Sequence, residues 1–209
     1  MDKSIKFLTE VGKLKGKARR GWTIHGFKNP ETTAEHIFSL AVLVWTLGKG
    51  KRLNMERAIK LALIHDICEV YAPDLTSYDA IALGEGKKIK DVLKMKKLSI
   101  GRPTNGERKK LEKIKQVLEE RAMKKLFSQM PEELKKEVKN LWIDYERGLT
   151  REARFVKQAD KIENLLQGMK YWKKYGKIPH HLWLRRIKEV VDDPDLVEFI
   201  YEIERKFYR

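Results

Sequence analysis

Cysteine is almost absent from this chain of 209 residues, which contains Cys68 alone. A single cysteine excludes a disulfide within the chain and is typical of a reducing compartment. The longest apolar stretch, from Leu40 to Leu47, is much too short to span a bilayer. The first residues also lack the apolar core of a signal peptide. We therefore expect a soluble, cytoplasmic protein with no membrane partner.

Long runs of like charge are also missing, although the chain is strongly basic. Lys and Arg together number 46 and Asp and Glu 30, which gives a net charge of +16. This excess favours anionic partners such as nucleotides, but it is equally consistent with solubility alone. Without a separate basic tail, a nucleic-acid partner is not expected. Charged residues reach 36 %, with Lys and Glu mixed along helices, a pattern typical of thermophile surfaces.

An alternating strand pattern is missing too, and the spacing of apolar residues is helical nearly throughout. We therefore predict an all-α fold with a single domain over residues 1–209. Breaking and capping residues place helices at 4–18, 32–47, 54–71, 107–127, 131–147 and 150–175, with Gly176 and Pro179 ending the last of these. Two terminal helices should flank Asp193-Pro194. Residues 74–106 are the least regular part, with a short helix at 87–98, and residues 82–106 resemble a surface insertion or lid.

The dipeptide His65-Asp66 lies inside the apolar run 61–69 and is the strongest functional signal. A hydrophobic helix seldom buries two adjacent ionisable residues unless something balances them. A divalent metal would do so, because imidazole and carboxylate are both good ligands. His36 starts a second apolar helix, and Asp160 lies in a third. Together these four residues suggest a metal hydrolase.

Two further acids accompany the pair. On a continuous helix Glu69 would share a face with His65 and Asp66, one turn further on. A carboxyl group there is suited to protonating a leaving oxygen or orienting a water, and Asp74 offers another. Each residue also has an ordinary interpretation on its own. His36 would be a satisfied or exposed histidine, Asp160 an ion-pair partner of a nearby lysine or arginine, and Cys68 a packing residue rather than a nucleophile.

Four local stretches carry a family resemblance: 19–22 (RRGW), 31–36 (ETTAEH), 62–69 (ALIHDICE) and 155–160 (FVKQAD). With them the chain resembles the HD-domain phosphohydrolase superfamily, and within it the 5′-deoxynucleotidase branch (HD domain-containing 2 and YfbR-like proteins). The resemblance implies a helical HD-domain bundle. It implies that the metal ligands are His36, His65, Asp66 and Asp160.

The resemblance also assigns the remaining site residues. The acidic catalytic residues fall on Glu69 and Asp74, although Pro73 stands where the family has a glycine before the second acid. Arg19 and Trp22 fall on the positions that face the nucleotide, with Arg20 an alternative for the arginine. From the residues alone, Arg19 is as consistent with a solvated charge, and Trp22 with a core side chain.

The implied reaction is the hydrolysis of deoxynucleoside 5′-monophosphates to deoxynucleosides and phosphate. Two histidines and two carboxylates suit one octahedral divalent ion, such as Co, Mn, Ni, Fe or Mg. The family also implies a homodimer. Two alternatives remain open: an HD phosphohydrolase acting on a nucleoside triphosphate, a cyclic nucleotide or an alarmone, and a non-catalytic basic helical protein that binds nucleic acid.

Overall fold

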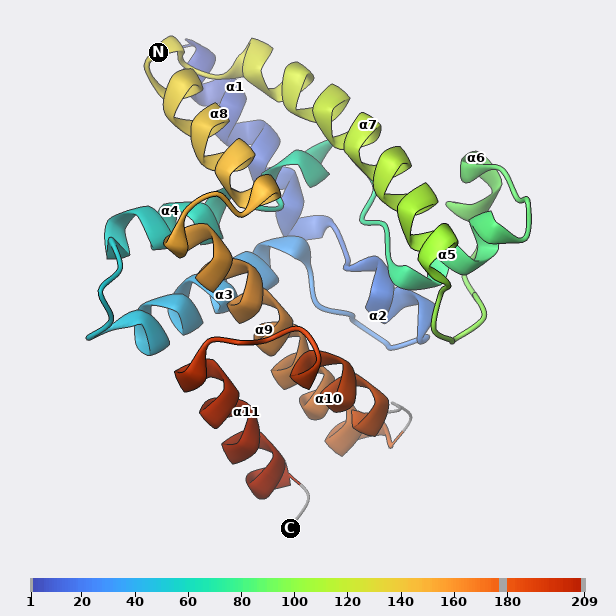
Figure 1. Ribbon diagram of the computed structural model, residues 1–209. Helices are drawn as coiled ribbons and strands as arrows, with labels where there is room; N and C mark the ends of the chain where they lie inside the picture. The colour runs from blue at the N-terminus through green and yellow to red at the C-terminus, as the bar shows by residue number, and fades with distance from the viewer. Residues whose placement is uncertain (1, 177–179, 208–209) are drawn as a thin grey trace. The chain divides into compact units, whose positions relative to one another are not determined.

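A computed structural model describes residues 2–176 and 180–207, and Figure 1 shows a chain built of helices. Within these ranges the structure contains no strand, only an isolated bridge between Ala18 and Thr32, so the predicted all-α fold is confirmed. Pro179, expected to break a helix, lies outside the described residues. None of the described helices combines the length and the apolar character needed to cross a membrane. The α-helices are α1 (Asp2–Gly12), α2 (Arg20–Ile24), α3 (Thr33–Gly48), α4 (Met55–Ile64), α5 (Ser77–Gly84), α6 (Ile89–Val92), α7 (Asn105–Gln129), α8 (Glu132–Arg147), α9 (Arg151–Tyr175), α10 (His180–Lys188) and α11 (Pro194–Phe207).

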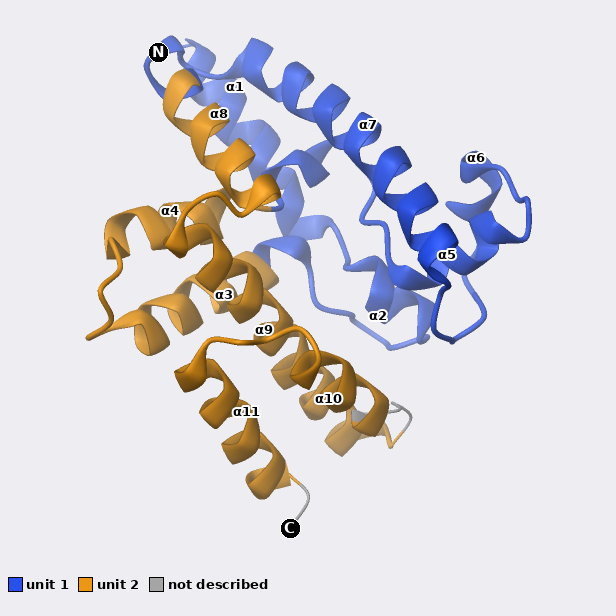
Figure 2. Cartoon of the chain, in the orientation of Figure 1, with its two compact units in different colours: residues 1–35, 66–135 blue, residues 36–65, 136–209 orange. Residues whose placement is uncertain are grey.

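The chain divides into two compact units, coloured separately in Figure 2. Unit 1 comprises Met1–Glu35 and Asp66–Lys135, and unit 2 comprises His36–His65 and Lys136–Arg209. One boundary falls near the start of α3, and the next falls at the peptide bond between His65 and Asp66. Each unit therefore contains segments far apart in the sequence, and the two residues of the His-Asp pair belong to different units.

Unit 1 is organised around the long helix α7. This helix contacts α5, α1 and the 3-10 turn η2 (Ile67–Val70). Val92 of α6 is completely buried and packs with Ala82 and Leu83 in a small apolar cluster. The segment 82–106 therefore contributes buried side chains to unit 1. Its predicted role as an insertion or lid stays a prediction.

Unit 2 is organised around the equally long helix α9, which contacts α4, α10 and α11 (Figure 1). Its buried side chains recur at helical spacing, because neighbouring helices cover several of its faces. Thr150 caps its first turn by accepting a hydrogen bond from the Ala153 amide at 3.2 Å. Gly176, at a positive φ of 64°, ends it. Asp160 and Glu163 lie among the buried residues of this helix.

Capping residues explain which helix boundaries the sequence predicts well. The Glu35 carboxylate accepts a hydrogen bond from the Thr32 amide at 2.8 Å, and the Thr32 hydroxyl accepts one from the Glu35 amide at 3.2 Å. This is the capping box expected at the start of the second predicted helix. Asn54 likewise caps α4 through the Arg57 amide at 3.0 Å. Both helices begin within one residue of their predicted start.

The prediction of one helix from 54 to 71 is wrong at its C-terminal end. The α-helix stops at Ile64, and Asp66 has φ −106° and ψ 13°, outside the helical range. The chain continues as the 3-10 turn η2. The Lys17 ammonium donates to the carbonyl oxygens of Glu69 and Ala72, which stabilises a turn that an α-helix would not form. Glu69 therefore follows Asp66 by one turn of 3-10 geometry, with its amide donating to the Asp66 carbonyl oxygen at 3.0 Å, and not by a turn of the continuous α-helix that was predicted.

Two elements of the irregular segment also differ from the prediction. Helix α5 was not predicted, although Thr76 and Asp79 form a capping box at its start. The helix predicted at 87–98 is a single turn, α6, from Ile89 to Val92. Glycines at 84, 86 and 101 obscured both, since a short helix between glycines has too few residues to show a helical period.

Candidate metal centre

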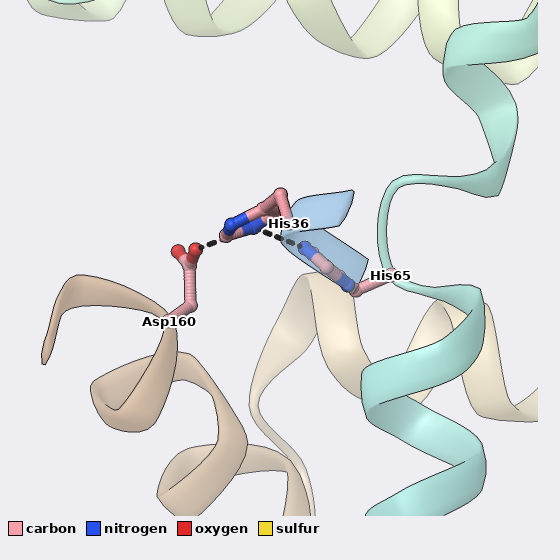
Figure 3. Close-up of side chains that lie close together, drawn as sticks. All are labelled: His36, His65 and Asp160. Carbon is pink, nitrogen blue, oxygen red and sulfur yellow. Dashed lines mark hydrogen bonds and ion pairs between the residues drawn. The ribbon is translucent and has the colours of Figure 1, made fainter. Parts of the chain in front are cut away.

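Three of the four predicted metal ligands converge in unit 2. Figure 3 shows His36 between His65 and Asp160. The Nε2 atom of His36 lies 3.2 Å from Nε2 of His65 and 3.2 Å from Oδ1 of Asp160. All three residues are buried, and their ligand atoms lie within 4.8 Å of one another. The residues come from the start of α3, the end of α4 and the middle of α9.

The hydrogen bonds at the far side of each imidazole ring decide what the converging atoms can do. Nδ1 of His36 lies 2.5 Å from a carboxylate oxygen of Glu163, and Nδ1 of His65 lies 2.8 Å from the carbonyl oxygen of Ala62. Because these partners are acceptors, each neutral ring carries its proton on Nδ1 and presents a lone pair at Nε2. Two nitrogen lone pairs and a carboxylate oxygen therefore point toward one another. Such a cluster is repulsive alone and fits a divalent cation.

Asp160 is held in place by neighbours on its own helix. The Lys161 ammonium donates to Oδ2 at 2.7 Å, and the Asn164 amide donates to Oδ1 at 2.9 Å. Burial alone would raise the pKa of Asp160, but the Lys161 ammonium and, in their protonated forms, the two histidines hold this pKa well below its usual value. The carboxylate therefore stays ionised, as a metal ligand must. Asp160 forms the ion pair with Lys161 that its ordinary interpretation predicts, and its role as a metal ligand stays a prediction.

The fourth predicted ligand, Asp66, belongs to unit 1, where it faces Arg19. One guanidinium nitrogen of Arg19 donates to Oδ2 of Asp66 at 2.5 Å. The same guanidinium lies 3.9 Å from carboxylate oxygens of Glu69 and Asp74. Unit 1 thus brings the predicted phosphate-binding arginine together with three of the predicted acidic residues. All four side chains are largely buried.

Glu69 is the most deeply buried acid of this group. Its carboxylate accepts a hydrogen bond from the Thr33 hydroxyl at 2.9 Å. Burial raises the pKa of Glu69 well above its usual value, and the nearby carboxylates of Asp74 and Asp66 raise it further. A carboxyl group that holds its proton at higher pH has the property required of a general acid.

The structure separates the roles of the two adjacent arginines. Arg20 binds the fully buried Asp79 through Nε at 2.9 Å and through a terminal nitrogen at 2.7 Å, and it also donates to the Val92 carbonyl oxygen. Its guanidinium is therefore engaged within the fold, whereas that of Arg19 faces the acidic group. Asp74 also accepts a hydrogen bond from the Arg20 amide at 2.8 Å, which fixes the backbone between the two arginines.

Trp22 and Cys68 are both buried in unit 1. Trp22 is only 3 % exposed, and its indole nitrogen donates to a carboxylate oxygen of Glu31 at 2.9 Å. This matches the core interpretation of the tryptophan, and its contact with a nucleotide stays a prediction. Burial, followed by the charges of Glu119 and Asp66, raises the pKa of the Cys68 thiol well above its usual value. Such a thiol is a poor nucleophile, in keeping with a packing role.

Comparison with known proteins identifies the family of this chain. Residues 11–193 match the family described as HD domain. The chain belongs to the HD domain family. It is 34 % identical over 167 residues to a human protein named 5′-deoxynucleotidase HDDC2, a match that covers 80 % of this chain and 67 % of the human one. It is 29 % identical over 176 residues to the Schizosaccharomyces pombe protein named 5′-deoxynucleotidase hdd1, covering 82 % and 74 %.

Two solved structures from archaea of the genus Pyrococcus share the fold. A conserved hypothetical protein from Pyrococcus furiosus is 25 % identical, with a TM-score of 0.66 over 96 % of this chain and 99 % of that one. A protein from Pyrococcus horikoshii, at 24 % identity, has a TM-score of 0.65 over 96 % and 98 %. Both matches span nearly the whole chain.

One residue of this HD domain was missed by the sequence argument. Glu163 accepts a hydrogen bond from Nδ1 of His36 and so fixes which nitrogen of that ring faces His65 and Asp160. The sequence does contain a feature that points to Glu163. Glu163 follows Asp160 by three residues on a helix whose buried positions are otherwise apolar, so both acids share a face. The pairing with His36, 127 positions away in the sequence, was not predictable from the helix alone.

Proposed function

We propose that this protein is a metal-dependent 5′-deoxynucleotidase that converts deoxynucleoside 5′-monophosphates to deoxynucleosides and phosphate. The observation that carries the proposal is the convergence of His36, His65 and Asp160 with their lone pairs facing one another. It occurs in a chain whose relatives are named 5′-deoxynucleotidases. Phosphomonoester hydrolysis is among the slowest uncatalysed reactions, so a cation at the phosphoryl group is a strong requirement.

The proposed ligands of the metal are His36, His65 and Asp160, with Asp66, the residue after His65, as the fourth. The cofactor is one divalent ion, with Co, Mn, Ni, Fe or Mg as candidates. When bound, it would offset the charge of the phosphoryl oxygens and activate a water molecule. Glu163 would keep the Nδ1 proton on His36, so that Nε2 remains available as a ligand.

The proposed substrate groups come from unit 1. Arg19 would bind the phosphate, because its planar fork matches two phosphate oxygens. Glu69, with its raised pKa, would deliver a proton to the leaving oxygen, and Asp74 would assist it. Trp22 would act on the sugar or base side as a buried wall rather than as an open stacking surface.

Phosphate release from a panel of nucleotides tests the proposal. Deoxy- and ribonucleoside mono- and triphosphates are each incubated with Co, Mn, Ni, Fe, Mg or Zn, and with a chelator as control. We expect chelator-sensitive release from deoxymonophosphates, with ribonucleotides slower. Release from triphosphates alone would assign the protein to another HD activity. If no nucleotide of the panel released phosphate, and the protein bound nucleic acid in a salt-sensitive way, the non-catalytic alternative would be favoured.

Substitutions separate the metal ligands from the proton donor. We expect His36→Ala and Asp160→Ala to lose both bound metal and activity. Glu69→Gln should keep the metal and lose at least about a hundredfold in rate, because only proton transfer is removed. The metal content of each purified variant is measured beside its rate. Retention of metal by both ligand variants would overturn the ligand assignment.

We also propose a homodimer, a thermophilic origin and a cytoplasmic location. A homodimer is supported by exposed apolar residues on one stripe of α3, where Phe38, Val42 and Trp45 are exposed. A thermophilic origin is supported by surface ion pairs such as that of Lys60 with Glu56 and Glu137, 2.6 and 2.7 Å apart. A cytoplasmic location rests on the single buried cysteine.

A further inference from the structure

Unit 2 contains a second concave site, away from the metal ligands. It is a pocket of about 610 Å³, within the range typical of small-molecule sites. Five of its lining residues are cationic and two are acidic: Lys51, Arg52, Arg151, Arg154 and Lys157 against Asp192 and Asp193. The remaining lining residues are Leu53, Phe155, Gln158 and Pro194. We propose that this pocket binds a small anion that carries two or more phosphate groups.

Both acids of the pocket already have hydrogen-bond partners, and the five cations outnumber them. Asp193 accepts from the Lys51 ammonium at 2.7 Å and caps α11 through the Leu196 amide at 3.2 Å. Asp192 accepts from the Gln158 amide at 2.8 Å. Asp193 therefore balances Lys51, and Asp192 joins α9 to the segment before α11 through Gln158.

The arginines, by contrast, keep free donors. Arg52 and Arg151 are exposed, and in the described part of the chain neither side chain forms a hydrogen bond or an ion pair. Arg154 uses one terminal nitrogen for the carbonyl oxygens of Gly148 and Leu149, at 3.1 and 3.0 Å. Its other nitrogens remain for a ligand. Three planar guanidinium groups around one pocket match several phosphate oxygens.

Helix geometry adds to the positive potential and separates the pocket from the metal ligands. The pocket contains the first residues of both α9 and α11, where the helix dipole is positive. Asp160 follows Arg151 by nine residues on α9, which places it about 14 Å further along the axis. The pocket residue Leu53 precedes α4, whereas His65 follows its end. The two sites therefore lie at opposite ends of α4.

Calorimetric titration with inorganic triphosphate, ATP and inorganic phosphate tests the site. The chelator EDTA is present throughout, so that no metal-dependent binding contributes. We expect one molecule of triphosphate or ATP per chain and much weaker binding of monophosphate. Tighter binding of ATP than of triphosphate would identify a nucleotide, and equal binding would identify the phosphate chain as the recognised group. Equal affinity for monophosphate and triphosphate would overturn the proposal.

Variants separate the pocket from the general charge of +16. The double substitution Arg52→Ala with Arg151→Ala should weaken triphosphate binding at least about tenfold and leave the melting temperature unchanged, since both side chains lack partners. A control pair with the same loss of charge, Arg121→Ala with Arg185→Ala, should change affinity less than about twofold. Equal losses in the two pairs would show diffuse attraction only. Loss of binding in Arg19→Ala would place the ligand at the proposed substrate site instead, and would also overturn the assignment.

Discussion

At the scale of single residues, the imidazole of His36 shows how a partner distant in the sequence fixes which ring nitrogen of a proposed metal ligand carries the proton. One ring nitrogen faces His65 and Asp160, and the other lies 2.5 Å from Glu163. The ring cannot turn over without placing a proton where the lone pair is needed. Glu163 therefore acts through His36, as a positioning residue.

Replacement of Glu163 by Gln tests this role. The Gln side-chain amide can present either its oxygen or its nitrogen to Nδ1, so the tautomer of the His36 imidazole is no longer fixed. We expect metal affinity to fall by about 10- to 100-fold, with excess metal restoring much of the rate. Metal titration followed by calorimetry, alongside activity at saturating metal, measures both effects. The control Glu202→Gln, at an exposed position on α11, should leave both unchanged. Unaltered affinity in Glu163→Gln would contradict the positioning role.

The candidate site was partly predictable at this scale. The proposed ligands were chosen as ionisable residues placed in apolar surroundings, a feature of the sequence itself. The environment of each residue was not predictable, because it depends on partners distant in the chain. Arg20 with Asp79, 59 positions apart, and Trp22 with Glu31 are examples. Only the folded chain distinguishes Arg19, which faces the acids, from Arg20, which is engaged by Asp79.

At the scale of elements, one carboxylate joins three helices of unit 2. Asp144 of α8 accepts hydrogen bonds from the amide and hydroxyl of Thr150, at 2.9 and 2.7 Å, and pairs with Arg57 of α4. Thr150 in turn caps α9, the helix that carries Asp160. Burial opposes ionisation of Asp144, but the Thr150 hydrogen bonds and the Arg57 guanidinium outweigh it and lower its pKa.

Replacement of Asp144 by Asn should destabilise the protein in a pH-dependent way. A lowered folded pKa contributes stability above the unfolded pKa and loses it as pH falls through the folded pKa. We expect a loss of about 2 kcal/mol in unfolding free energy at pH 7. The difference from the native protein should shrink below about pH 4. Denaturant unfolding at pH 7, 5 and 3 measures it. The exposed Asp91, changed to Asn, serves as control, and a pH-independent difference would contradict the assignment.

Helix prediction succeeded where a capping residue or a long segment with helical spacing of apolar residues was present. Helices α3, α7, α8 and α9 begin and end within about two residues of their predicted bounds, because Thr or Pro marks each start. The prediction failed at residues 65–71. There the apolar pattern continues while the backbone leaves the helix at Asp66, held by the Lys17 ammonium from a distant segment. Local periodicity does not contain that contact.

At the scale of the whole molecule, unit 2 should depend on the metal for part of its stability. A cation bound by His36, His65 and Asp160 would join α3, α4 and α9 and remove the repulsion among the three ligand atoms. At free metal a hundredfold above the dissociation constant, the stabilisation is about 2.7 kcal/mol. We expect chelation to lower the melting temperature by about 5 to 10 °C. Asp160→Ala should show no response to metal. A melting curve that is identical with metal and with chelator would contradict the site.

The proposed dimer depends on an exposed surface of α3, whereas the metal centre depends on a cluster of buried side chains. Phe38 and Trp45 are 70 % and 62 % exposed, and with Val42 they follow the i, i+4, i+7 spacing of one helix stripe. A monomer that exposed this stripe to water would carry an aggregation liability, and a second copy of the same face would bury it.

Replacement of Trp45 by Glu places a charge at the end of this stripe. Burying an unpaired charge in an apolar interface is unfavourable, so the variant should be a monomer at micromolar concentration while the native protein is a dimer. Its melting temperature should fall only by the part that association contributes, because Trp45 has few contacts within the chain to lose. The control Leu149→Glu changes an exposed leucine away from α3 and should remain dimeric. Light scattering after size exclusion gives the mass of each. A native protein that is a monomer, or a Trp45→Glu variant that stays dimeric, would remove α3 as the interface, whatever the outcome at the metal centre.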